Sequence, residues 1–70
     1  MVPLTFVAVG ETVLIKKISG KDETKHFLES LGFIVGSEVT IISKFGQNFI
    51  INVKETRVAL DQTLVKRIFV

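Results

Sequence analysis

Cysteine, tryptophan and tyrosine are absent from this 70-residue sequence, and histidine occurs only once. Without cysteine the chain has neither a disulfide framework nor a thiolate metal site, and a single imidazole does not make an all-protein zinc site. A chain this short also fills one small core and leaves no room for a large enclosed active site. Its stability must therefore come from the packing of apolar side chains or from a partner.

Strong charge of one sign and long apolar runs are also absent. Nine Lys and Arg stand against seven Asp and Glu, so the net charge is +2, and the cations are dispersed along the chain. Nucleic-acid binders usually carry a basic patch, so this charge argues against that class. The longest apolar run, Phe6 to Val9, is too short to cross a membrane, and no segment has the pattern of a cleaved signal peptide. We therefore expect a cytoplasmic protein without a membrane-inserted segment.

What the sequence does have is a high content of residues that favour strands. Ten Val, eight Ile and six Thr are β-branched, and no repeat or low-complexity segment divides the chain. Alternation and turn residues predict strands at 12–18, 38–44, 48–54, 56–60 and 66–70. The second and third would form a hairpin around Gly46, and Asp61 to Leu64 would form a capped single turn. We predict a mainly β fold with a single domain at 1–70: a small, partly open SH3-like β-barrel of about five strands, with one short helix inserted after the first strand.

The helix is predicted from Asp22 to Leu31, with Asp22 as its N-cap. The positions that share its apolar face are Thr24, Phe27, Leu28 and Leu31. Gly32 would end the helix in a left-handed conformation, and Phe33 would then pack on Leu28 as in a Schellman ending.

Charged residues on this helix are the candidates for a metal site. Glu23 and His26 have the Glu-x-x-His spacing that places both side chains on one helical face, and Glu29 follows three residues later. In helical bundles such a motif acts together with carboxylates from other helices, and only one helix is predicted here. An exposed histidine among charges on a solvated face is the competing interpretation. The expectation is at most a weak surface site for Fe2+ or another divalent transition metal, and no other cofactor.

Catalytic chemistry finds little support. Four serines, one histidine and two aspartates occur, but no segment resembles a nucleophile elbow or an oxyanion loop. We therefore expect a protein that is not an enzyme and has no catalytic residues.

All six aromatic residues are phenylalanine. Phe27, Phe33 and Phe49 fall on positions predicted to face the core. Phe45 and Phe69 do not, and neither do two isoleucines, Ile42 and Ile50. These four are candidates for an exposed apolar patch that binds a partner. The alternative is that they are isolated apolar residues of the kind that any small protein exposes.

The order of these segments resembles the ferrous-iron transport protein A family, FeoA, from Leu4 to Val70. The segments that carry the resemblance are Gly10-Glu11, Leu14 to Ile18 with Gly20, Phe27 to Phe33, Gly36 to Val39, Thr56 to Leu60 and Arg67 to Val70. Two positions depart from the family pattern: Lys25 and His26 stand where the helix often has an arginine pair, and Asn48-Phe49 lacks a common proline.

The resemblance implies a small cytoplasmic accessory or regulatory protein of bacterial ferrous-iron uptake. Its partner would be FeoB, a membrane transporter that imports ferrous iron and carries a GTP-binding domain. On this basis we add Arg57 to the candidate partner-binding residues. Two alternatives stay open: a stand-alone SH3-like barrel that binds nucleic acid, and a metal-linked regulatory module like the C-terminal domain of DtxR-type repressors. The oligomeric state also stays open, since an uncovered edge strand could pair with another copy.

Overall fold

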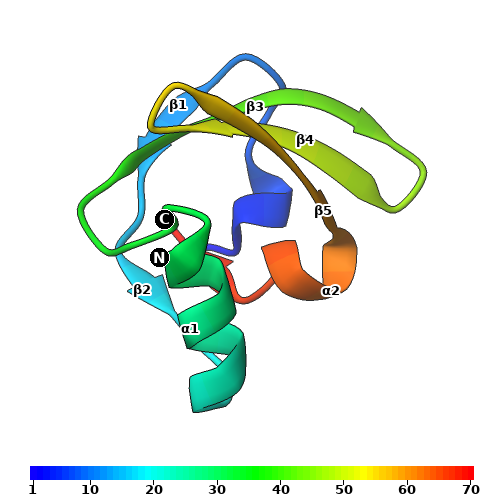
Figure 1. Cartoon of the computed structure of the whole chain (residues 1–70). Coiled ribbons are helices and arrows are strands. Elements are labelled where there is room, and N and C mark those ends of the chain that lie inside the picture. The colour runs from blue at the N-terminus through cyan, green and yellow to red at the C-terminus, as the bar shows by residue number, and fades with distance from the viewer.

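The strands of the computed structural model, which describes residues 1–70, lie in two small antiparallel sheets (Figure 1). The strands are β1 (Thr12–Leu14), β2 (Lys17–Ile18), β3 (Glu38–Phe45), β4 (Asn48–Val53), β5 (Thr56–Asp61) and β6 (Ile68–Phe69). The helices are η1 (Leu4–Phe6), α1 (Asp22–Ser30) and α2 (Gln62–Val65). One sheet has the order β1-β3-β4-β5, and the other pairs β2 with β6. The prediction of a mainly β fold with one short helix between early strands is confirmed.

The predicted first strand, 12–18, is wrong as a single element. It divides into β1 and β2, which belong to different sheets, so six strands are present rather than about five. The division occurs at Ile15 and Lys16: the Ile15 amide donates to the Ser37 carbonyl, whereas the Lys16 amide donates to the Phe69 carbonyl. The apolar alternation also breaks here, because the buried residues are Ile15 and Ile18, three positions apart.

The C-terminal end of α1 has the predicted Schellman geometry. Gly32 has a φ of 106°, and its amide donates to the Glu29 carbonyl over 2.9 Å. The Phe33 amide donates to the Leu28 carbonyl over 3.0 Å, and both of these side chains are fully buried. The N-terminal end differs from the prediction: Lys21 is the N-cap, it makes no side-chain cap hydrogen bond, and Asp22 is the first helical residue.

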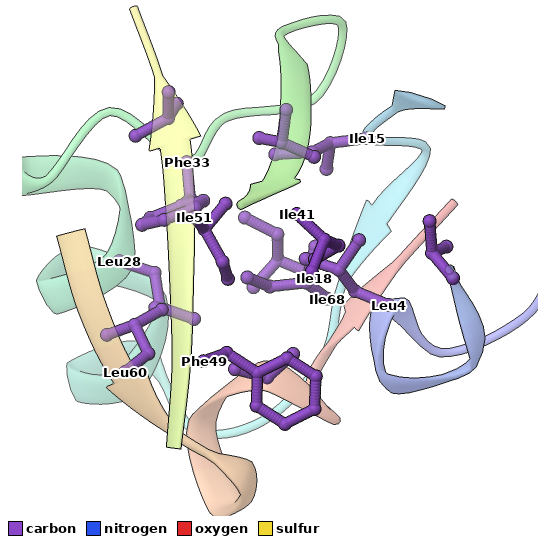
Figure 2. Packing of buried hydrophobic residues seen from close by; sticks show 14 residues of the cluster. Leu4, Ile15, Ile18, Leu28, Phe33, Ile41, Phe49, Ile51, Leu60 and Ile68 are labelled. Atoms are coloured by element: carbon purple, nitrogen blue, oxygen red, sulfur yellow. The ribbon is translucent and has the colours of Figure 1, made fainter. Parts of the chain in front are cut away.

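The core is made entirely of apolar side chains. Fourteen buried residues form one cluster, and no polar side chain is buried among them. Figure 2 shows that side chains from α1 and from strands β3 to β6 point into the same interior. Phe33 and Phe49 belong to this cluster as predicted, but Phe27 is 49% exposed, so its assignment to the core was wrong. Leu28 occupies the centre of the buried stripe of α1, and Phe27 lies about 100° around the helix from it.

The β3–β4 hairpin is confirmed, with Gly46 and Gln47 as the connecting residues. A bulge interrupts the register between Ile41 and Ser43. Beyond it, Lys44 pairs with Phe49 on the core side of the sheet, and its ammonium lies 5.4 Å from the centre of that ring. The bulge therefore reverses which residues of the distal half of β3 face outward.

The two chain ends lie together beside β6. Val2 and Val70 exchange two backbone hydrogen bonds, of 3.0 Å and 2.9 Å, and Pro3 forms a bridge with Phe69 (Figure 1). The predicted capped turn before β6 is confirmed, because the Leu64 amide donates to the Asp61 carboxylate at the start of α2. None of the helices combines the length and the apolar character that crossing a membrane requires.

Candidate partner-binding surface

The face of the four-stranded sheet that points away from the core is uncovered. Figure 1 shows α1, α2 and η1 on the opposite side of this sheet. We call this surface the outer face. It carries the residues that alternate with the buried ones. Its members are Thr12, Leu14, Glu38, Thr40, Ile42, Ser43, Phe45, Asn48, Ile50, Asn52, Arg57, Ala59 and Asp61.

Three of the predicted partner-binding residues meet at one end of the outer face. The bulge sets Ile42 and Ser43 against Ile50, and Phe45 follows at the hairpin tip opposite Asn48. Phe45 is 57% exposed, and Ile42 and Ile50 are half-buried. We call Ile42, Phe45 and Ile50 the apolar end of the outer face. An exposed aromatic ring beside two aliphatic side chains gives a partner apolar area to bury.

The other two predicted residues occupy different positions. Arg57 lies on the outer face in β5, exposed, and pairs with Asn52. Phe69 is half-buried in β6, where it pairs with Lys17 in the second sheet. The structure therefore brings Arg57 onto the same face as the apolar end, but it does not bring Phe69 there.

The opposite end of the outer face holds a polar hollow that the sequence analysis missed. Its volume is about 430 Å³, and no hydrophobic residue lines it. The lining residues are Thr12, Ser37, Glu38, Thr40, Asn52, Lys54 and Glu55. The hydroxyls of Thr12 and Thr40 share a hydrogen bond of 2.8 Å across β1 and β3. Polar residues at the outward positions of three adjacent strands were the available signal, but recognising the hollow required knowing that those strands are neighbours.

The helical candidates for a metal site do not gather into a cluster of ligands. Glu23, His26 and Glu29 are exposed on α1, and no group of three or more His, Cys, Asp or Glu residues in the structure could hold a metal ion. Glu29 instead borders a small groove of about 130 Å³ between α1, β2 and the segment at Ile34 and Val35. One imidazole and scattered carboxylates do not fit a high-affinity transition-metal site.

Asp61 is the one acidic residue whose protonation the structure clearly perturbs. The hydroxyl of Thr63 donates to its carboxylate, and the Leu64 amide donates to the same oxygen over 3.2 Å. These two hydrogen bonds favour the ionised form and lower the pKa of Asp61 below its ordinary value. The carboxylate caps α2, so this perturbation has a structural explanation.

Comparison with known proteins identifies the family. The FeoA domain model matches residues 2–70. The chain belongs to the FeoA family. A relative in Methanocaldococcus jannaschii, named "Putative Fe(2+) transport protein A", is 33% identical to this FeoA chain over 70 residues, which are 100% of the chain and 85% of the relative.

Solved FeoA structures share the fold. The crystal structure of an iron uptake regulatory protein, FeoA, superposes with a TM-score of 0.88 at 27% identity, covering 96% of this chain and 89% of that one. A zinc complex of Stenotrophomonas maltophilia FeoA, described as a procaryotic SH3 domain protein, gives a TM-score of 0.82 at 25% identity over 94% and 85% of the two chains. The predicted SH3-like fold and FeoA membership are therefore both confirmed, and they associate this chain with a family whose members are named for ferrous-iron transport and iron uptake.

Proposed function

We propose that this FeoA chain is a cytoplasmic accessory protein of ferrous-iron uptake and that it binds the cytoplasmic part of a FeoB-type transporter through the apolar end of the outer face. It acts by binding and catalyses no reaction itself, and ferrous iron is the cargo of the transporter. The observation that carries the proposal is the exposed cluster of Ile42, Phe45 and Ile50 on an uncovered sheet face of a FeoA-family chain.

Two features of this cluster suit a binding role. The backbone of Phe45 is held at a hairpin tip by strand pairing, so little backbone freedom is lost when a partner covers the ring. Complete burial of a phenylalanine side chain contributes about 1.5–3 kcal/mol, which corresponds to roughly a tenfold to hundredfold change in Kd. Arg57 lies on the same face, where a rim charge would orient a partner rather than dominate the affinity.

The experiment is calorimetric titration of the isolated cytoplasmic domains of a FeoB-type transporter into this chain and its variants. Phe45→Ser is expected to weaken binding about tenfold or more, because it removes the central apolar contact. Phe27→Ser is the matched control, since Phe27 is similarly exposed, at 49% against 57%, but lies on α1 outside the outer face. Circular dichroism spectra should show that both variants are folded.

Three results would contradict the proposal: no detectable heat at high micromolar concentration, equal weakening by both substitutions, or weakening by Phe27→Ser alone. A titration with nucleic acid distinguishes the alternative class. Release of counterions would make nucleic-acid affinity fall steeply with added salt, whereas the apolar contact should change little.

A further inference from the structure

The edge of β5 is a long strand edge without a partner. β5 is the last strand in the order β1-β3-β4-β5, and its pairing with β4 runs without interruption from Thr56 to Asp61 (Figure 1). The two-residue turn at Lys54 and Glu55 makes Val53 and Thr56 a hydrogen-bonded pair. Because hydrogen-bonded and non-hydrogen-bonded pairs alternate along an antiparallel ladder, the backbone N–H and C=O groups of Thr56, Val58 and Leu60 bond to β4. The backbone N–H and C=O groups of Arg57 and Ala59 therefore point away from the sheet, and no turn, loop or side-chain hydrogen bond occupies them.

Several of the usual protections of a strand edge are missing from β5, although it carries the charged residues Arg57 and Asp61. It contains no proline, its register with β4 has no bulge, and its inward residues Val58 and Leu60 are apolar. β1, at the other end of this sheet, has only three residues. β6 is bordered by β2 on one side and by Val2 and Pro3 on the other. β5 is thus the edge that is best suited to accept another strand.

We propose that β5 pairs with β5 of a second copy of this chain, antiparallel and centred on Ala59. In this register Ala59 faces its own counterpart, and its small side chain allows close approach. Arg57 of each copy then lies directly opposite Asp61 of the other, about 5.5 Å apart between Cα atoms. Both side chains are exposed and lie on the outer face. Two ion pairs, each between Arg57 of one copy and Asp61 of the other, therefore connect the two β5 strands.

Charge complementarity selects this register among the neighbouring ones. A centre at Arg57 would oppose two arginines, and a centre at Asp61 would oppose two aspartates. A centre at Val58 would place Asp61 opposite Glu55. Only the centre at Ala59 opposes Arg57 to Asp61, and on the core side it also sets Val58 against Leu60. A second copy of β5 therefore matches this edge better than an extended peptide that lacks these complementary charges.

Pairing of the two β5 strands would join both four-stranded sheets into a continuous eight-stranded sheet, in which the two outer faces lie side by side.

Sedimentation velocity from about 10 µM to about 1 mM, a range that spans weak association, measures the self-association. The expected result is a reversible dimer. Arg57→Glu places Glu opposite Asp61 and should raise the dimer Kd about tenfold. Lys16→Glu is the matched control, because it makes the same change of charge at an exposed residue outside β5 and should leave the Kd unchanged.

A mixture of two variants tests the register itself. Asp61→Lys places Lys opposite Arg57 and should also weaken the homodimer. Mixing the Arg57→Glu chain with the Asp61→Lys chain creates two pairs of opposite charge, so association should be restored. Since Asp61 also caps α2, circular dichroism must show that Asp61→Lys is folded.

Amide hydrogen exchange of the unmodified chain tests the same register without any substitution. The amides of Arg57 and Ala59 should become protected as concentration rises, whereas those of Thr56, Val58 and Leu60 should be protected throughout. A chain that stays monomeric to about 1 mM would overturn the inference. So would a dimer in which Arg57 and Ala59 exchange freely, or protection that appears only when a transporter fragment is added.

Discussion

Asp61 connects two elements through one side chain. It is the last residue of β5 and the N-cap of α2, and its carboxylate accepts hydrogen bonds from the Thr63 hydroxyl and the Leu64 amide. These bonds are stronger to the ionised carboxylate than to the neutral acid. The lowered pKa of Asp61 therefore means that its cap stabilises the fold when it is charged.

This linkage predicts a stability that depends on pH. Because the folded-state pKa of Asp61 is depressed, its contribution is fully present above the unfolded value of about 3.9 and is lost as pH falls through the lower folded value. Asp61→Ala should therefore lower the Tm by several degrees at about pH 7, with a smaller difference at about pH 2.5. Thermal melts of both chains at the two pH values measure this.

Asp22→Ala is the matched control for this measurement. Asp22 is the first residue of α1, where the N-cap Lys21 makes no side-chain cap hydrogen bond. At neutral pH, Asp22→Ala should lower the Tm of the chain by less than Asp61→Ala does. If the Tm difference between Asp61→Ala and the unmodified chain stayed constant from neutral to acid pH, the assignment of Asp61 as a charged cap would be contradicted.

Among elements, the β4–β5 hairpin has an unusual turn. Lys54 and Glu55 have φ values of 49° and 63°, although neither is glycine or asparagine. Such a two-residue turn normally takes Asn-Gly, since side chains are disfavoured at positive φ. The stem of Lys54 lies against Gly32, close enough that a Cβ at Gly32 would be 3.5 Å from the Lys54 Cδ. Both residues are exposed, but the stem of Lys54 packs against the end of α1.

Glu55→Gly is accordingly expected to stabilise the chain. Removing the side chain from a left-handed conformation should raise the free energy of unfolding by about 1–2 kcal/mol. The greater flexibility of glycine in the unfolded chain should offset about 0.5–1 kcal/mol of this gain. Urea unfolding should show a net gain of roughly 0.5–1 kcal/mol. Glu11→Gly, which removes the same charge at a residue without positive φ, should be neutral or destabilising. A loss of stability in Glu55→Gly would argue against strain in this turn.

Local chemistry explains which elements could be predicted from the sequence. The end of α1 was predictable, because Gly32 and Phe33 satisfy a Schellman ending through neighbouring backbone groups alone. The break at Ile15 and Lys16 was not, because it depends on hydrogen bonds to Ser37 and Phe69, which are distant in sequence. Tertiary pairing overrides local strand propensity at that point.

The same distinction applies to the candidate surface. Strand alternation correctly placed Ile50 and Arg57 outward. Phe45 faces outward because of the bulge, since unbroken alternation from Val39 and Ile41 would have turned it inward. The sequence did not show that Phe69 lies away from these residues, because alternation alone does not reveal that β6 belongs to a different sheet. The polar hollow was missed for a related reason: it is assembled from β1, β3, β4 and the turn after β4.

At the scale of the whole molecule, the interior contains no buried polar or charged side chain. All fourteen buried residues are apolar, and the largest hollow is on the surface of the sheet. We therefore propose that this FeoA chain binds its partners through its surface. The apolar end of the outer face and the edge of β5 are the two surfaces to which we assign binding.

The most direct test of the central claim is an NMR titration of the isotope-labelled chain with the unlabelled cytoplasmic domains of a FeoB-type transporter. We expect the largest amide shift changes in the second half of β3 and the first half of β4, around Ile42, Phe45 and Ile50. The amides of α1 should change little. Changes concentrated on α1, or no changes at saturating concentration of the domains, would contradict the claim.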